Sequence, residues 1–322
     1  LSVSSAASDV YKRQLYDKRL LADLRAVLKK AKRLAIESES FIALQDILRW
    51  EQRVVLRTTE SNINQTVSQL HDEMAALLTK VAELNDLERL NLVVQRLIRQ
   101  IGVTRTVDDR NRFTSILRDS LLEEGNAGNS ASARVMHHNI KSTCYFALGS
   151  VARCSFHLQE QVKIWGVMPI WKKERTGDFL ALLNNTAITQ IQKQDYEGLF
   201  ETLEHFKDAF RFDGGKHIDA RTFYYKHRLD YYLFQEQPLL DSNLLDEVIN
   251  HLDENNERMI KAHETALRLT IAKICFANHD LDKTITQLNH LLNQPRNDLQ
   301  KDVQSVARLL LLIAHYEAGH TR

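Results

Sequence analysis

The stretch Lys261–Leu292, KAHETALRLTIAKICFANHDLDKTITQLNHLL, decides the fold of this 322-residue chain. Its apolar residues recur at the three- and four-residue spacing that places them on one face of an α-helix. They predict one helix from about 263 to 278 and a second from 281 to 292, with Asp280 as the N-cap of the second. Because neither helix can bury its stripe alone, we expect an antiparallel hairpin that packs against similar neighbours.

The same pattern repeats along the chain. Short corners, most of them following an aromatic residue, recur at positions 150, 195, 238, 280 and 320, which are 45, 43, 42 and 40 residues apart. A period of that length, filled by two helices, is typical of an α-solenoid. We therefore predict an all-α fold, an α-solenoid of stacked antiparallel hairpins over residues 131–322, tetratricopeptide-like in class. The expected hairpins are 131–148 with 151–165, 179–192 with 196–210, 220–234 with 244–252, 263–278 with 281–292, and an incomplete last one over 298–318.

An N-terminal region, residues 15–123, precedes the repeats. It is predicted to contain a helix over 15–38, its partner over 41–56, one long helix over about 60–100 and a shorter helix over 107–122. In the long helix the apolar positions keep a four-three spacing, slip by three residues near Asn85 and Asp86, and then resume. Since the heptads are interrupted, packing within the chain is favoured over a dimeric coiled coil.

Residues 1–14 are set apart from the fold. The segment Ser4–Gln14, SSAASDVYKRQ, matches the in-frame translation of a common sequencing-library adapter. We therefore assign residues 1–14 to an adapter-derived segment and expect its removal to leave the melting temperature unchanged. On the same reasoning, we expect the native N-terminus to be missing and the last hairpin to be cut near His320.

Composition narrows the class of protein. The chain has 10 Gly, 3 Pro, 43% hydrophobic and 26% charged residues, a composition that indicates a folded helical protein. A balance of 43 basic and 42 acidic residues predicts no nucleic-acid partner. The longest aliphatic run, 309–314, is too short to cross a bilayer, so no membrane association is expected. Three cysteines without metal-binding spacing favour buried thiols and a cytoplasmic location.

No catalytic or metal-binding motif is found, so the chain is predicted to be no enzyme and to need no cofactor. The doublet His137-His138 cannot place both rings on one helix face, and a satisfied or solvent-facing pair is favoured over a metal site. Residues 213–216, DGGK, lack the features of a phosphate-binding loop. Trp165 and Trp171 are interpreted as core-edge packing, with a ligand-binding aromatic pair as the alternative.

Several segments resemble a family of uncharacterised Bacteroidota proteins with tetratricopeptide-like repeats. The resemblance is carried by Leu182-Leu183-Asn184-Asn185, by the stretch QKQDYEGLFETLEHF and above all by NDLQKDVQSVARLLLLIAHYEAGH. It covers residues 15–322 and implies a cytoplasmic helical-repeat protein. It implies no activity and no functional residues.

Candidate partner-binding residues follow from the repeat. Arg268 and Arg308 occupy equivalent positions relative to Phe276 and Tyr316, Arg228 lies two positions out of register, and Tyr225 is expected to be more exposed than its aromatic neighbours. A ladder of guanidinium groups could bind carboxylates of a peptide, whereas Arg268 shares its face with apolar residues, which favours a structural role. The predicted function is a non-catalytic scaffold for protein–protein interaction. The alternative is a regulatory module that senses a ligand or peptide.

Overall fold

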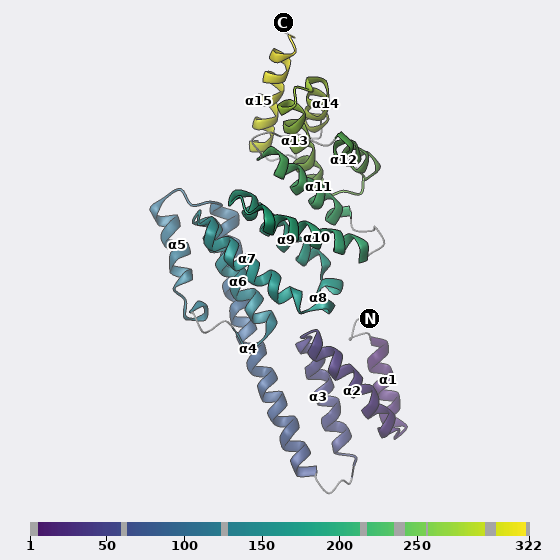
Figure 1. The fold of residues 1–322 in the computed structure, drawn as a ribbon. Helices are drawn as coiled ribbons and strands as arrows, with labels where there is room; N and C mark the ends of the chain where they lie inside the picture. Colours follow the sequence, from purple (N-terminus) through teal and green to yellow (C-terminus); the bar gives the residue numbers. More distant parts are fainter. Residues whose placement is uncertain are drawn as a thin grey trace. The chain divides into compact units, whose positions relative to one another are not determined.

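In a computed structural model, the structure describes residues 6–58, 63–123, 128–212, 218–234, 242–255, 257–293 and 301–319. In those ranges the regular secondary structure is helical throughout, with no strand, which confirms the predicted all-α class (Figure 1). The chain divides into two compact units, residues 1–175 and 176–322. The division lies between two helices that follow the first predicted repeat, and not at the loop near residue 124 where the repeats were expected to begin.

The first unit contains eight of the described α-helices. Helices α2 and α3 form one antiparallel pair joined by a short turn, and α6 and α7 form another. Successive helices pack against one another from α1 to α4, and α4 then packs against α6. The bounds are α1 Ala6–Asp17, α2 Leu21–Glu37, α3 Phe41–Val55, α4 Ile63–Ile101, α5 Val107–Leu117, α6 Ala131–Ala147, α7 Val151–Gly166 and α8 Pro169–Glu174, with a short 3₁₀ helix at Ser120–Leu122.

Helix α4 contributes residues to two hydrophobic clusters, as the slip in the spacing of its apolar residues suggests. In its first half, Leu70 and Leu77 pack in one cluster with Leu48 of α3. In its second half, Leu87 and Val94 pack in another cluster with residues of α5 and α6. The slip near residue 85 lies between the two halves. A three-residue shift rotates the apolar stripe around the helix, and this rotation lets one uninterrupted helix face two different neighbours.

Part of the segment set apart in the sequence forms a helix. Residues from Ala6 onward form α1, which packs against α2. Lys12 is only 5% exposed, and its Nζ lies 2.6 Å from Asp9 and 2.6 Å from Asp46 of α3. The helix predicted over 15–38 is also interrupted, because Arg19 adopts a left-handed conformation, with φ 58°, between α1 and α2.

The second unit contains the remaining described α-helices. Successive helices pack in the order α9, α10, α11, α13, α14 and α15, and α12 joins through a cluster of leucines that it shares with α11 and α13. The predicted pairing of α11 with α12 is thus less direct than the packing of α11 against α13. The bounds are α9 Thr176–Gln192, α10 Tyr196–Phe212, α11 Ile218–Leu233, α12 Ser242–Asn255, α13 Lys261–Ala277, α14 Leu281–Leu292 and α15 Lys301–Glu317.

One turn geometry recurs at the ends of the first helices of the hairpins. A residue with positive φ follows the helix, and its N–H donates to the carbonyl three residues earlier, as in Schellman-type C-caps. At α13 this residue is His279, and Asp280 then caps α14 by accepting from the N–H of Lys283 at 3.1 Å, as the sequence predicts. The residues in this conformation are Glu39, Gly149, Gln194, His279 and Gly319.

The three cysteines lie in these cores. Cys144, Cys154 and Cys275 are buried free thiols, as expected. Burial raises the pKa of Cys144 to about 12 and those of Cys154 and Cys275 to about 11. A thiol with such a pKa carries almost no thiolate at neutral pH, so these residues act as small apolar side chains. Among the described helices, none combines the length and apolar character needed to cross a bilayer.

Candidate functional site

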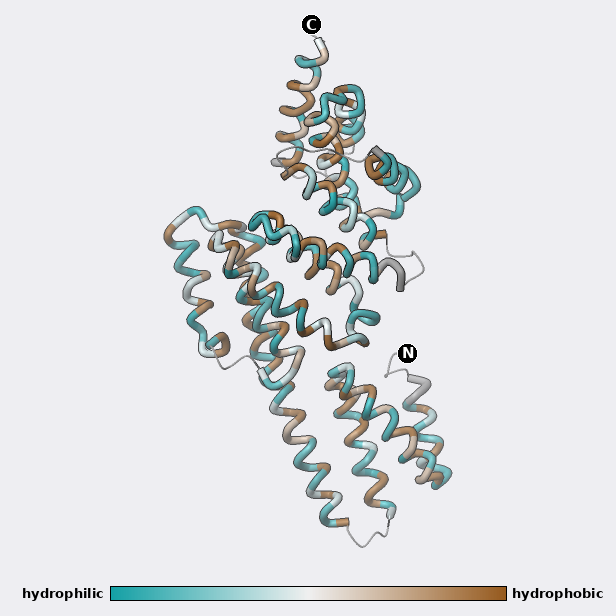
Figure 2. Tube along the Cα trace, in the orientation of Figure 1, coloured by the Kyte–Doolittle hydropathy of each residue, from teal (hydrophilic) through white to brown (hydrophobic). Residues whose placement is uncertain are grey.

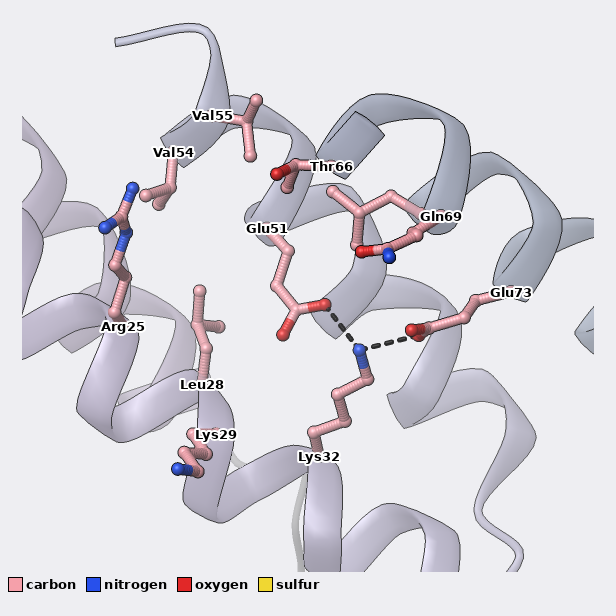
Figure 3. Close-up of a pocket in the computed structure, with 11 residues that line it drawn as sticks. Arg25, Leu28, Lys29, Lys32, Glu51, Val54, Val55, Thr66, Gln69 and Glu73 are labelled. Atoms are coloured by element: carbon pink, nitrogen blue, oxygen red, sulfur yellow. Dashed lines mark hydrogen bonds and ion pairs between the residues drawn. The ribbon is translucent and has the colours of Figure 1, made fainter. Parts of the chain in front are cut away.

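A hollow of about 340 Å³ lies among α2, α3 and α4 of the first unit (Figure 3). Arg25, Lys29 and Lys32 of α2 line it, and of these Lys32 points between the two carboxylates of Glu51 in α3 and Glu73 in α4. The floor is apolar, with Leu28 from α2 and valines from α3. The volume is at the lower end of the range for small-molecule sites. The remaining lining residues are Val54, Val55, Thr66, Gln69 and Leu70.

Lys32 occupies the centre of the charged part of this hollow. Its Nζ lies 2.8 Å from Glu51 of α3 and 2.6 Å from Glu73 of α4. Burial works to lower the pKa of Lys32, but hydrogen bonds and charge from the two glutamates outweigh it, so the pKa is raised. Lys32 therefore stays a cation and joins three helices. It is unsuited to act as a nucleophile, because that role needs a neutral amine.

A cluster of three histidines lies between α6 and α7. Nδ1 of His138 is 2.9 Å from Nδ1 of His157, and the ring of His137 packs edge-on against His138. Tyr145 stacks on His157 with an interplanar angle of 3°. Burial, together with neighbouring positive charge, lowers the pKa of His137 to about 4 and that of His157 to about 3. At neutral pH the imidazoles are thus uncharged.

The histidine cluster does not form a metal centre. In the part of the chain that the structure describes, no group of three or more His, Cys, Asp or Glu residues could hold a metal ion. The residues DGGK at 213–216 lie outside the described ranges. His137 is buried against the 3₁₀ helix region and His138 is partly buried, so the doublet packs between helices of the first unit.

The tryptophan pair also belongs to the core. Trp165 of α7 and Trp171 of α8 are each 2% exposed and meet edge to face at 5.5 Å between ring centroids. Nε1 of Trp171 donates to the backbone oxygen of Ser38 at 2.7 Å. The interpretation as packing is confirmed.

Tyr225 was predicted to be exposed, and this prediction is wrong. The side chain is 4% exposed and packs in one cluster with Leu229 of its own helix and Val248 of α12. The error has a physical origin: α11 is packed on more than one side, so residues away from its main apolar stripe are covered as well. Arg228 of the same helix is half-buried, and its Nη1 donates to the hydroxyl of Tyr224 at 3.1 Å.

Arg268 is enclosed at the junction of α13 and α14. It is 4% exposed, its Nε donates to Glu264 at 2.8 Å, and its Nη1 donates to the Oε1 of Gln287 at 3.0 Å. Burial alone would raise the pKa of Glu264, but its hydrogen bonds with Arg268 and Lys261 lower it, so the pair is ionised. This is the structural role favoured by the sequence: the guanidinium binds inside its own hairpin and also lies 3.9 Å from Asp253 of α12.

Arg308 differs from Arg268, since it is exposed on α15. The predicted ladder of equivalent guanidinium groups is therefore wrong: one is buried, one is half-buried and one is exposed. The packing of neighbouring helices determines how far each arginine is exposed. The spacing of residues along the sequence carries no information about which helix is covered.

Next to Arg308 lies a feature that the partner-site prediction missed. Hydrophobic residues recur along α15, as the brown segments of its trace show in Figure 2, and several of them are exposed at the spacing of one helix face. Leu312 is 67% exposed and Tyr316 is 69% exposed. The signal was present in the sequence as apolar residues at helical spacing along this helix. The members of this α15 stripe are Val306, Leu309, Leu312, Ile313 and Tyr316.

Comparison of the chain with protein-family models, with curated proteins and with solved structures gave no match.

Proposed function

We propose that this chain is an α-solenoid scaffold that binds a protein partner and carries out no chemistry itself. One observation carries the proposal: the α15 stripe exposes large apolar side chains next to one another on a single helix face. Contiguous apolar surface of this kind marks interaction sites in folded proteins. Scattered exposed leucines would carry no such meaning.

The turn geometry supports the solenoid arrangement. A residue in the left-handed conformation, with the same backbone hydrogen bond, recurs at several helix ends in both units. The hairpins bury apolar stripes against their neighbours. Stacked hairpins present extended surfaces suited to peptides and protein segments. The alternative, a ligand-sensing regulatory module, loses much of its support, because Trp165, Trp171 and Tyr225 are core residues.

Site-specific photocrosslinking tests the scaffold function. A benzophenone amino acid replaces Leu312 in one variant and Glu201, an exposed residue of α10, in a matched control. Both variants are irradiated in cells of the source organism. We expect a protein adduct at position 312 that is missing at position 201, and the purified partner should bind the wild-type chain directly.

Loss of that direct binding on substitution completes the test. Leu309→Asp should weaken the purified complex at least tenfold, because burial of one leucine contributes about 1.5–3 kcal/mol. An adduct pattern that is the same at both positions would contradict the proposal, as would a complex that Leu309→Asp leaves unchanged.

A further inference from the structure

Helix α15 ends in the same turn that joins α13 to α14. Gly319 has φ 74° and His279, 40 residues earlier, has φ 59°. The N–H of each donates to the carbonyl three residues before it, at 3.0 Å, from Gly319 to Tyr316 and from His279 to Phe276. The two helices are therefore in register at an offset of 40 residues, and each position of α13 has a defined counterpart on α15.

The register allows the face of α13 that α14 covers to be compared with the same face of α15. On α13, Ala272 is fully buried and Leu269 is partly buried, in a cluster with Leu288 and Leu291 of α14. The residues at this position of α6 and α9, seven before the left-handed residue, are likewise buried: Ser142 and Ala187. On α15 the counterparts are Leu309 and Leu312, and both are exposed.

The buried arginine of α13 adds a charge to this comparison. Arg268 donates to the Oε1 of Gln287 on the covering helix α14. It also forms an ion pair with Glu264, which lies one turn earlier on α13. On α15 the arginine is kept as Arg308, but the counterpart of Glu264 is Gln304. Arg308 is exposed, and none of the residues whose side chains the structure describes forms an ion pair with it.

We propose that the α15 stripe binds an amphipathic helix that lies antiparallel to α15 and carries an acidic residue followed directly by a Leu-x-x-Leu pair. The two leucines would take the places that Leu288 and Leu291 occupy over α13, against Leu309 and Leu312. The acidic residue would take the place of Gln287 and pair with Arg308, supplying the negative charge that Gln304 lacks. A charged partner suits a guanidinium at a surface that becomes desolvated on binding. This proposal rests on the scaffold function and specifies the chemistry of its partner.

The chain itself supplies the probe. A peptide of residues 280–293 with Gln287→Glu, acetylated, amidated and fluorescently labelled, reproduces the covering helix with the acidic residue in place. The unchanged 280–293 peptide is its matched control. Fluorescence anisotropy with the full chain should show the Gln287→Glu peptide binding about tenfold more tightly than the control, since a charged acceptor strengthens a hydrogen bond to a guanidinium.

Variants of the full chain locate the peptide on α15. Leu312→Asp should weaken binding of the Gln287→Glu peptide at least tenfold, while Phe234→Asp, at another exposed aromatic position of the second unit, should leave it unchanged. Arg308→Glu should remove the preference for the Gln287→Glu peptide, and a Gln287→Lys peptide should restore binding to that variant.

Two results would overturn the proposal. One is equal affinity of the Gln287→Glu and unchanged peptides, including no binding of either. The other is binding that Leu312→Asp does not weaken. If crosslinking at Leu312 still captures a partner that binds directly, the scaffold function stands with a partner of different structure, so the two failures are distinguishable.

Discussion

Single side chains make contacts in this chain that span large distances along the sequence. Glu39, in the turn between α2 and α3, caps the N-terminus of α6: its Oε1 accepts from the N–H of Ala131 and its Oε2 from the N–H of Ser132, both at 2.7 Å. Ser130 adds an ordinary N-cap by accepting from the N–H of Ala133. A carboxylate at a helix N-terminus satisfies free N–H groups and complements the helix dipole.

Removing this carboxylate should destabilise the first unit. We expect Glu39→Ala to lower the free energy of unfolding by about 1–3 kcal/mol, because two N–H groups lose a charged acceptor. Glu39→Gln should cost less, since one amide oxygen remains. Urea unfolding followed by circular dichroism measures both, with Glu37→Ala, at an exposed residue of α2, as the control. Equal effects of Glu39→Ala and Glu37→Ala would contradict the capping role.

The histidine cluster makes a prediction about pH. The pKa values of His137, about 4, and His157, about 3, lie below the ordinary value of 6.5, so the unfolded chain binds protons that the folded chain excludes. Stability should therefore fall as the pH drops from about 6.5 to about 4. Thermal melts across this range should show a smaller decrease for His137→Gln than for wild type, while His290→Gln, on an exposed part of α14, should follow wild type. A wild-type slope retained by His137→Gln would exclude His137 as a cause of the decrease.

At the scale of the helix, sequence periodicity predicted most of what is found. It located α3, α6, α7, α13 and α14 to within a residue or two at most ends, because their apolar residues keep helical spacing from one end to the other. It failed where burial is two-sided, as at Tyr225, and where the position equivalent to a buried one is exposed, as at Arg308. Neither condition changes the spacing of apolar residues within the helix, so periodicity cannot report it.

The first helix provides an element-scale prediction. The match to an adapter translation set residues 1–14 apart, yet Lys12 bridges α1 to Asp46 of α3 and is buried. Deletion of residues 1–14 should lower the melting temperature by about 2–4 °C, as expected for about 1 kcal/mol in a domain of this size. Lys12→Ala should reproduce part of the loss, and Lys18→Ala, at an exposed position, should not. An unchanged melting temperature after the deletion would restore the original assignment.

At the scale of the whole molecule, each compact unit has clusters of its own. In the second unit, Leu288 is fully buried among residues of α13, α14 and α15, whereas Leu309, at the surface of α15, is 60% exposed. The sequence predicted stacked hairpins but not the division at residue 175, because the division depends on which helices pack together and not on the pattern within any one of them.

This contrast gives a paired prediction. Leu288→Asp should unfold the C-terminal helices, because it places a charge in an apolar cluster. Leu309→Asp should leave stability within about 0.5 kcal/mol of wild type. Hydrogen exchange with mass spectrometry should show lost protection in residues 261–317 of the Leu288→Asp variant, with protection retained in residues 21–166. Loss of protection throughout the chain would show that the two units unfold together.

The buried thiols have a practical consequence for spectroscopy. Maleimide dyes react with thiolates, and Cys144, Cys154 and Cys275 are buried with pKa values of about 11 to 12. A cysteine newly introduced on the surface of α10 or α15 would thus react in their presence, with the native residues left in place. Donor and acceptor dyes could then be attached to the native sequence background, and distances within the second unit could be followed by energy transfer as a helix docks on α15.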